Sequence, residues 1–299
     1  MRLVTTLDGR PAALVPDGAT ERLLDLTPVV GQAALADVLA DPGATARVRA
    51  AVAHAHHAPA DLPPADGVRL GPPVRPGKIL CLGYNYRGHV AAGADPHGDD
   101  PAYPDVFVKT PNTLCGPDDA VALPAAADDV DYEGEIAVVI GRRAHRVSVA
   151  DAMDHVAGYT LFDDVSDRGW QGRSSQWELG KCFDGFGPLG PALVTADEVP
   201  DFHDLLVEVE RDGVVTVSQS TSTMVFTLPF LVHYLSEVMT LEPGDVISTG
   251  TPQKLPEALA AHRPLAHGDA VTIRVVLGEH PLALTTRFVD ADRSEGENR

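Results

Sequence analysis

The sequence predicts an α+β protein that is rich in β-strands, and three observations support this fold class. After residue 77, short apolar segments of strand length follow one another without the regular alternation with helices that a doubly wound sheet shows. Helical patterns are sparse in that region, the clearest being 229–239. A proline-rich stretch, 59–76, separates this region from a small α/β module at the N-terminus, because its six prolines exclude a helix and disfavour a central strand.

The N-terminal module is predicted to combine a hairpin with two helices. Segments 3–5 and 12–15 flank an Asp8-Gly9 turn, a pattern typical of a β-hairpin. Helical stretches follow at 33–39 and 44–57, separated by a break at 41–43. The chain therefore divides into a module at 1–58, a linker at 59–76, a catalytic domain at 77–289, and a polar tail at 290–299 that we expect to be disordered.

The region after the linker is predicted to be a succession of short strands. An Asp212-Gly213 turn joins two of them as a hairpin. The expected strands are 78–82, 106–109, 133–140, 158–162, 206–211, 214–218, 245–248 and 270–276.

The composition limits the partners that this protein can have. Its 23 Lys and Arg against 43 Asp and Glu give a net charge of −20, which argues against nucleic acid and anionic membranes as partners. No apolar run approaches the roughly 18 residues of a membrane span, and the N-terminus lacks a signal-peptide core. Three widely spaced cysteines without a CxxC pair argue against a disulfide framework or a structural zinc site. We therefore expect a soluble, cytoplasmic protein.

Carboxylates gather at the ends of two predicted strands. Glu133 and Glu135 point to the same face, because side chains alternate along a strand. Asp163 and Asp164 follow a second apolar segment and face opposite ways, so at most one joins the glutamates. A divalent cation would relieve their repulsion, and an all-oxygen ligand set favours Mg²⁺, Mn²⁺ or Ca²⁺ over zinc. The alternative is a solvated strand end with one raised carboxyl pKa.

Two further residues are candidates for catalysis. Lys181, one of only four lysines, lies in a glycine-rich and aromatic stretch and could stabilise an enolate or bind a substrate carboxylate. Its alternative role is a structural ion pair. His89 follows a glycine- and tyrosine-rich segment and is a candidate general base, although a lone histidine is more often structural. The segment 249–252 ends a strand where backbone N–H groups or a hydroxyl could meet an anion.

Taken together, these segments resemble the fumarylacetoacetate hydrolase family over roughly residues 76–288. The matching pieces occur in the family's order and each is weak alone, but the ordered set is specific. They are Leu82-Gly83-Tyr84-Asn85-Tyr86-Arg87-Gly88-His89, Phe107-Val108-Lys109, Asp131-Tyr132-Glu133-Gly134-Glu135, 158–166, Gly180-Lys181-Cys182-Phe183-Asp184, 241–247 and Thr249-Gly250-Thr251-Pro252.

The resemblance implies a mixed β-roll or sandwich domain that is usually homodimeric and binds Mg²⁺ or Mn²⁺, with Ca²⁺ as a further candidate. It implies a mobile lid at about 87–103 that carries His89 as the group activating water. Further roles follow by motif position: Glu133, Glu135 and Asp164 as metal ligands, Lys181 beside the metal, and Tyr84, Arg87, Lys109, Gln171 and Thr251 on the substrate side.

The sequence departs from the family pattern where water would be oriented. The lid histidine is commonly paired with a glutamate three residues later, and here that position is Ala92. The final acid of another motif is replaced by Gly169, and a glycine-rich stretch is replaced by 253–256. Either Asp95, Asp99 or Asp100 substitutes as the partner of His89, or the reaction needs no activated water.

Three functions remain open from the sequence. The leading hypothesis is a metal-dependent hydrolase that cleaves a C–C bond in a small anionic 1,3-dicarbonyl acid of the acylpyruvate type. The second is a decarboxylase or isomerase of an oxo acid on the same scaffold, for which the metal's stabilisation of an enolate is the main requirement. The third is a non-catalytic binding protein that retains the fold.

Overall fold

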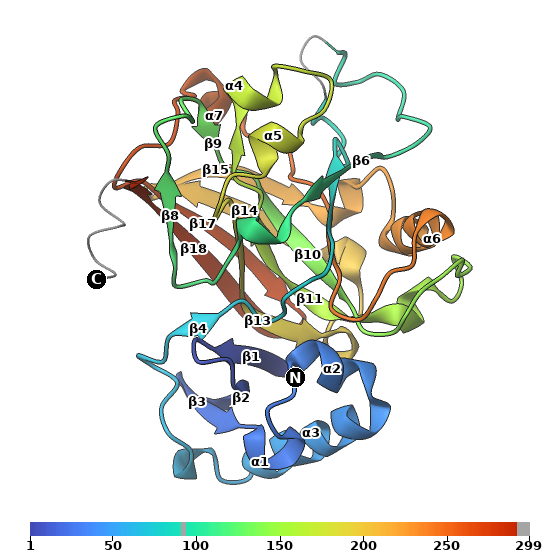
Figure 1. The fold of residues 1–299 in the computed structure, drawn as a ribbon, viewed down its shortest axis with the longest axis vertical. Helices are drawn as coiled ribbons and strands as arrows, with labels where there is room; N and C mark the ends of the chain where they lie inside the picture. Colours follow the sequence, from blue (N-terminus) through green and yellow to red (C-terminus); the bar gives the residue numbers. More distant parts are fainter. Residues whose placement is uncertain (91–93, 292–299) are drawn as a thin grey trace.

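A computed structural model describes residues 1–90 and 94–291 of the chain, and strands dominate it, which confirms the predicted β-rich α+β class (Figure 1). The largest sheet has eleven strands. Its main order is β3-β2-β1-β13-β11-β10-β16-β5-β6, with β4 paired to β1 and β7 to β13. The bounds are β1 Arg2–Thr6, β2 Pro11–Asp17, β3 Thr20–Asp25, β4 Leu70–Gly71, β5 Ile79–Gly83, β6 Asp105–Lys109, β7 Leu114–Cys115, β10 Gly134–Ile140, β11 Val156–Asp163, β13 Gly187–Thr195 and β16 Val246–Ser248.

A second sheet has five strands, all from the chain after the predicted linker. Its order is β15-β14-β17-β18-β8, and a separate two-stranded pair joins β9 to β12. The bounds are β8 Ala120–Leu123, β9 Val130–Asp131, β12 Ser166–Asp167, β14 Leu206–Arg211, β15 Val214–Ser220, β17 Ala270–Leu277 and β18 His280–Asp290. The predicted hairpin turn at Asp212-Gly213 connects β14 to β15, so that expectation is confirmed.

The central strand β10 is buried on both faces, which explains its continuous apolar sequence. Ile136 and Val138 belong to the large core that includes Val209 of β14 and Ile273 of β17. Side chains that alternate with them enter a second core, shared with the N-terminal helices and exemplified by Val139. Because every position of β10 is buried, a charged side chain on this strand has little access to water and needs a partner.

The helices are few and mostly short. In the described residues they are α1 Thr27–Val30, α2 Leu35–Ala40, α3 Pro42–Ala55, α4 Arg168–Gln171, α5 Glu178–Lys181, α6 Leu228–Val238 and α7 Pro256–Ala260. Helices α2 and α3 agree with the predicted stretches within a few residues, and α6 agrees with the predicted helix at 229–239. None of these helices is long and apolar enough to cross a membrane.

The N-terminal strands are continuous with the large sheet. The predicted hairpin forms as β1 and β2, and β1 then pairs antiparallel with β13 through Arg2↔Val194 and Leu3↔Leu193. The strand β4, which lies in the predicted linker, pairs with the other end of β1. The 1–58 module therefore shares main-chain hydrogen bonds with a strand almost 200 residues away in the sequence.

All eight strands predicted after the linker are present with small shifts at their ends, but the sequence patterns missed others. The longer of these are β3, β13 and β18. The tail predicted at 290–299 begins too early, because Asp290 still belongs to β18; residues 292–299 of that tail lie outside the described residues, as do 91–93 of the predicted lid, including Ala92.

Candidate metal centre and active site

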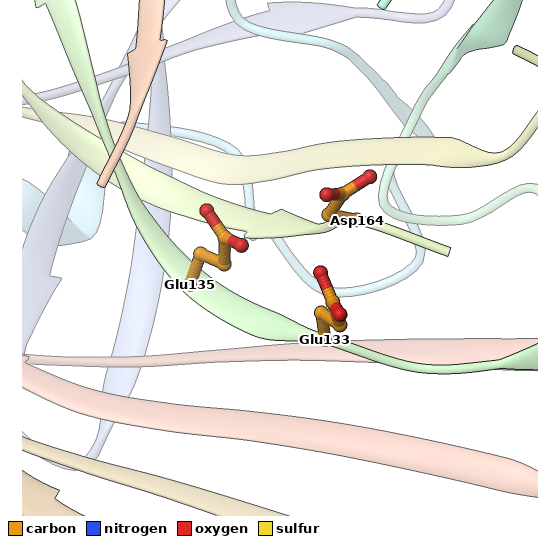
Figure 2. Close-up of side chains that lie close together, drawn as sticks. All are labelled: Glu133, Glu135 and Asp164. Atoms are coloured by element: carbon orange, nitrogen blue, oxygen red, sulfur yellow. The ribbon is translucent and has the colours of Figure 1, made fainter. Parts of the chain in front are cut away.

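Three buried carboxylates meet where β10 and β11 run side by side. Gly134 pairs with Asp163 across these antiparallel strands, so the start of β10 lies beside the end of β11. Each of Glu133, Glu135 and Asp164 offers a carboxylate oxygen, and these three oxygens lie within 4.8 Å of one another (Figure 2). The glutamates share a face, as strand alternation predicts.

Asp163 faces away from this cluster, in agreement with the expectation that only one of the two aspartates joins the glutamates. Its Oδ1 accepts a hydrogen bond of 3.3 Å from the backbone N–H of Glu133. Burial raises the pKa of the Asp163 carboxyl to about 7. The three-residue cluster is therefore built from neighbouring strands, with Asp163 supporting the backbone behind it.

Gly134 lets the backbone between the two glutamates approach the second sheet. A Cβ at this position would lie 2.5 Å from Val209 Cγ2 and 2.8 Å from Ile273 Cγ1, closer than any ordinary carbon contact. The glycine therefore fixes how deeply Glu133 and Glu135 sit between the sheets.

Cationic side chains surround the carboxylates. Lys181 Nζ donates to Glu133 Oε2 and to Asp164 Oδ2, both at 2.6 Å, and is nearly inaccessible to solvent. Lys109 Nζ donates to Asp164 Oδ1 at 2.6 Å and to the Val165 carbonyl at 2.9 Å. The structure thus places Lys109 against Asp164, inside the protein.

Arg168 is a cationic residue that sequence reasoning passed over. Its guanidinium lies 2.7 Å from Glu133 Oε1 and 2.8 Å from Asp131 Oδ2. It also donates a hydrogen bond of 2.9 Å to Gln171 Oε1. Lys254 forms a further ion pair with Asp131. The sequence feature that could have indicated Arg168 is its position four residues after Asp164. There the chain turns into α4, which begins at Arg168, and the guanidinium reaches Glu133.

The surroundings shift the pKa values of Glu133 and Glu135 in opposite directions. Burial by itself would raise the pKa of Glu133, but Arg168 and Lys181 hold it well below its ordinary value. Glu135 has its pKa raised well above the ordinary value, first by burial and then by the charges of Asp164 and Glu133. The two glutamates of the cluster therefore differ, because Glu133 contacts Arg168 and Lys181 whereas the charges nearest Glu135 include those of the other two carboxylates.

Glu135 is held by the end of the neighbouring strand β16. Its Oε2 accepts hydrogen bonds from the Ser248 hydroxyl and, at 2.9 Å, from the Gly250 N–H. Thr251 donates its hydroxyl to the Gly134 carbonyl at 3.0 Å, which ties the loop after β16 to β10. The predicted segment 249–252 thus meets the carboxylate site through one backbone N–H.

A cavity of about 420 Å³ opens next to the cluster. Its lining includes Glu133, Arg168 and Lys181 of the charged cluster, whereas Glu135 and Asp164 are fully buried and do not line it. The predicted residues Tyr84, His89, Gln171 and Thr251 also line it, together with Trp177, which no sequence pattern singled out. Arg87 and Lys109 do not line this cavity.

His89 is oriented by a backbone carbonyl. Its Nδ1 lies 2.8 Å from the Thr251 oxygen, and its ring meets Tyr84 edge-on with centroids 5.6 Å apart. A carbonyl can only accept a hydrogen bond, so Nδ1 carries the proton and Nε2 of the neutral ring is free to act as a base. Among the described residues no carboxylate forms a hydrogen bond or ion pair with His89.

The three aspartates considered as substitutes for the missing lid glutamate have other surroundings. Asp100 accepts two hydrogen bonds from the Arg87 guanidinium, at 3.1 and 2.6 Å. Asp95 accepts the His97 backbone N–H at 2.9 Å. Asp99 lines a neighbouring cavity with them.

The residues present fit a small divalent cation. The donor set is three carboxylates, all oxygen, and hard cations such as Mg²⁺ and Mn²⁺ prefer such ligands. In the described part of the chain no lysine or arginine forms an ion pair with Glu135, whose Oε2 accepts hydrogen bonds from the Ser248 hydroxyl and the Gly250 N–H. Glu133, Glu135 and Asp164 would hold the ion, and Lys181 lies against two of them.

Comparison with known proteins identifies the family. The model of the fumarylacetoacetate (FAA) hydrolase C-terminal domain matches residues 78–287. A putative hydrolase of Burkholderia multivorans is 46% identical over 246 residues, covering 81% of this chain and 82% of that protein. The chain belongs to the fumarylacetoacetate hydrolase family, as the order of its motifs predicts.

Two solved structures show the range of chemistry among similar proteins. Maleylpyruvate hydrolase from Sphingobium sp. SYK-6, in complex with manganese(II) and pyruvate, has a TM-score of 0.77 and 29% identity, over 97% of this chain and 99% of that one. The 5-carboxymethyl-2-hydroxymuconate delta-isomerase from Mycobacterium smegmatis has a TM-score of 0.73 and 31% identity, with the same coverage. Hydrolases and isomerases thus share this fold.

Proposed function

We propose that this protein is a divalent-metal-dependent hydrolase that cleaves a C–C bond in a small 1,3-dicarbonyl acid of the acylpyruvate type. The observation that carries the proposal is the buried cluster of three carboxylates beside a cavity lined by two cations and a histidine. The similar maleylpyruvate hydrolase, whose structure contains Mn²⁺ and pyruvate, supports a metal and an oxo-acid substrate. The bound metal would supply Lewis acidity toward the oxo-acid oxygens.

The protein's side chains stabilise the developing charge and transfer the proton. Arg168 and Lys181 offer positive charge to the substrate carboxylate and to the enolate oxygen that develops as the C–C bond breaks. His89 accepts a proton at Nε2 from the water that attacks the distal carbonyl. The products are a carboxylic acid, which keeps the oxygen of that water, and a 2-oxo acid, which takes up a proton at the carbon released.

Other residues position these groups. Tyr84, Gln171 and Thr251 line the cavity on the substrate side. Lys109 holds Asp164 from within the core and acts as a positioning residue. Arg87 lies outside this cavity, in an ion pair with Asp100.

The test is turnover of acylpyruvates by the purified protein with Mg²⁺ or Mn²⁺ in ¹⁸O-labelled water. Hydrolysis incorporates one labelled oxygen into the released carboxylic acid. The Glu135→Ala variant should lose activity and bound metal together, with Glu237→Ala on the exposed face of α6 as the matched control. Full activity and full metal content in Glu135→Ala would show that the proposed mechanism is wrong.

A second candidate is an oxo-acid decarboxylase or isomerase. Two observations favour it: the absence of a carboxylate partner for His89 in the described part of the chain, and the isomerase among the similar structures. Release of CO₂, or a shifted double bond without ¹⁸O incorporation, would identify it. If no oxo acid of a broad set is turned over with either metal, the protein would instead be a non-catalytic binding protein.

We also propose a homodimer located in the cytoplasm, on the strength of the family and the expectations from sequence. Light scattering coupled to gel filtration tests the oligomer: a mass near twice 31.6 kDa is expected, and a mass near 31.6 kDa contradicts it.

A further inference from the structure

A second cavity adjoins the one beside the carboxylate cluster. It encloses about 730 Å³ and is formed by the chain between β5 and β6, from residues on both sides of the segment 91–93. Tyr84, His89 and Val90 line both cavities, so they form the wall that the two share. A ligand longer than the first cavity that extends past His89 would enter the second.

The two cavities have opposite electrostatic character. Of the charged residues that line the first cavity, Arg168 and Lys181 outnumber Glu133, so this lining is net positive and suits the anionic head of an oxo acid. The charged residues that line the second are four aspartates and a single arginine: Asp95, Asp99, Asp100, Asp105 and Arg87.

The single arginine of the second cavity is already neutralised. Arg87 donates from Nε and Nη2 to the same Asp100 oxygen, at 3.1 and 2.6 Å, in a charge-assisted pair. A substrate carboxylate would have to displace Asp100 to reach the guanidinium. Beside the aspartates, apolar surface comes from Val90, Pro96, Pro101 and Val225.

We propose that the substrate carries one negative charge only, at its oxo-acid head, and that its distal chain is uncharged and enters the second cavity. This inference rests on the proposed function, because it takes the first cavity as the place of the oxo-acid head. A distal carboxylate is rejected by like charge from Asp95, Asp99 and Asp105 and by the occupation of Arg87. The protein thereby selects monocarboxylate over dicarboxylate oxo acids of the same length.

The test is calorimetric binding of two matched ligands to the Mn²⁺-loaded protein. The ligands are 2-oxoheptanoate and 2-oxoheptanedioate, which differ only in a terminal methyl or carboxylate. We expect the monoacid to bind at least tenfold more tightly to the wild type. Asp100→Asn removes the negative charge that neutralises the Arg87 guanidinium, so the preference should fall at least fivefold through a gain in diacid affinity.

The control variant is Asp61→Asn, which removes the same charge at an exposed turn of the N-terminal region outside both cavity walls, and should leave the preference unchanged. Equal or tighter binding of the diacid to the wild type would overturn the inference, as would binding of neither ligand. Binding with the expected preference but no hydrolysis of the matching acylpyruvates would instead refute the proposed reaction and leave the selectivity intact.

Discussion

Replacing Glu135 by glutamine should stabilise the metal-free protein while removing most of its stabilisation by a bound metal. The glutamine side chain would keep an acceptor oxygen for the Ser248 hydroxyl and the Gly250 N–H, so the local hydrogen bonds survive. What disappears is a buried charge close to two others, Glu133 and Asp164. The substitution therefore measures the free-energy cost of charge repulsion at the site without changing the packing around the side chain.

The magnitude follows from the geometry. Two unit charges no more than 4.8 Å apart repel by at least about 3 kcal/mol at an effective dielectric constant of ~20. Lys181, which contacts both Glu133 and Asp164 at 2.6 Å, offsets part of this repulsion. A net relief on the order of 1 to 3 kcal/mol is expected, and at roughly 2 °C per kcal/mol for a chain of this size the Tm rises by about 2 to 6 °C.

The sign of the pH dependence is a second readout of the same variant. Because the folded pKa of Glu135 lies well above its unfolded value, folding takes up a proton. The stability of the wild type is therefore fully present below the unfolded pKa and is lost as pH rises toward the folded pKa. The advantage of Glu135→Gln should accordingly grow as the pH rises from just above the unfolded glutamate pKa of about 4.3 toward the raised folded pKa.

The assay is thermal unfolding after treatment with a chelator, followed by titration with Mg²⁺ or Mn²⁺. A ligand that binds the native state at 100 times its Kd stabilises the wild type by about 2.7 kcal/mol, and the variant should lose most of that gain. Glu237→Gln, an equal change at an exposed position of α6, should shift stability by no more than about 0.5 kcal/mol. A metal-free Glu135→Gln protein that unfolds at lower temperature than the wild type would refute the reasoning.

Three other substitutions have defined outcomes. Lys181→Met removes one cation from Glu133 and Asp164, which keep Arg168 and Lys109 respectively, and should cost about 1.5 to 3 kcal/mol in chemical unfolding of the metal-free protein; a loss below about 1 kcal/mol would contradict this. His89→Asn can still donate to the Thr251 carbonyl but has no base, so kcat/KM should fall about 10²- to 10⁴-fold with the Tm retained; unchanged turnover would exclude His89 as the base. Gly134→Ala forces a Cβ against Val209 and should weaken Mn²⁺ binding as well as stability, and calorimetry showing wild-type affinity would refute that coupling.

Local patterns were sufficient for much of the site. Strand alternation placed Glu133 and Glu135 on one face and separated Asp163 from Asp164, because the two-residue repeat of a strand fixes which way a side chain points. Hairpin turns such as Asp212-Gly213 depend only on neighbouring residues and were likewise predictable. The order of the motifs identified the family without any structure.

The tertiary structure alone decided which distant segments meet and which side of a carboxylate each cation occupies. The pairing of β1 with β13 joins the N-terminal hairpin to the large sheet, and no local pattern encodes a partner almost 200 residues away. Lys109, expected on the substrate side, instead supports Asp164 from the core, and Arg168 reaches Glu133 from α4. The two-residue repeat of a strand determines the face from which a side chain projects. The residues that this side chain contacts depend on how separate strands and helices pack, which only the whole fold determines.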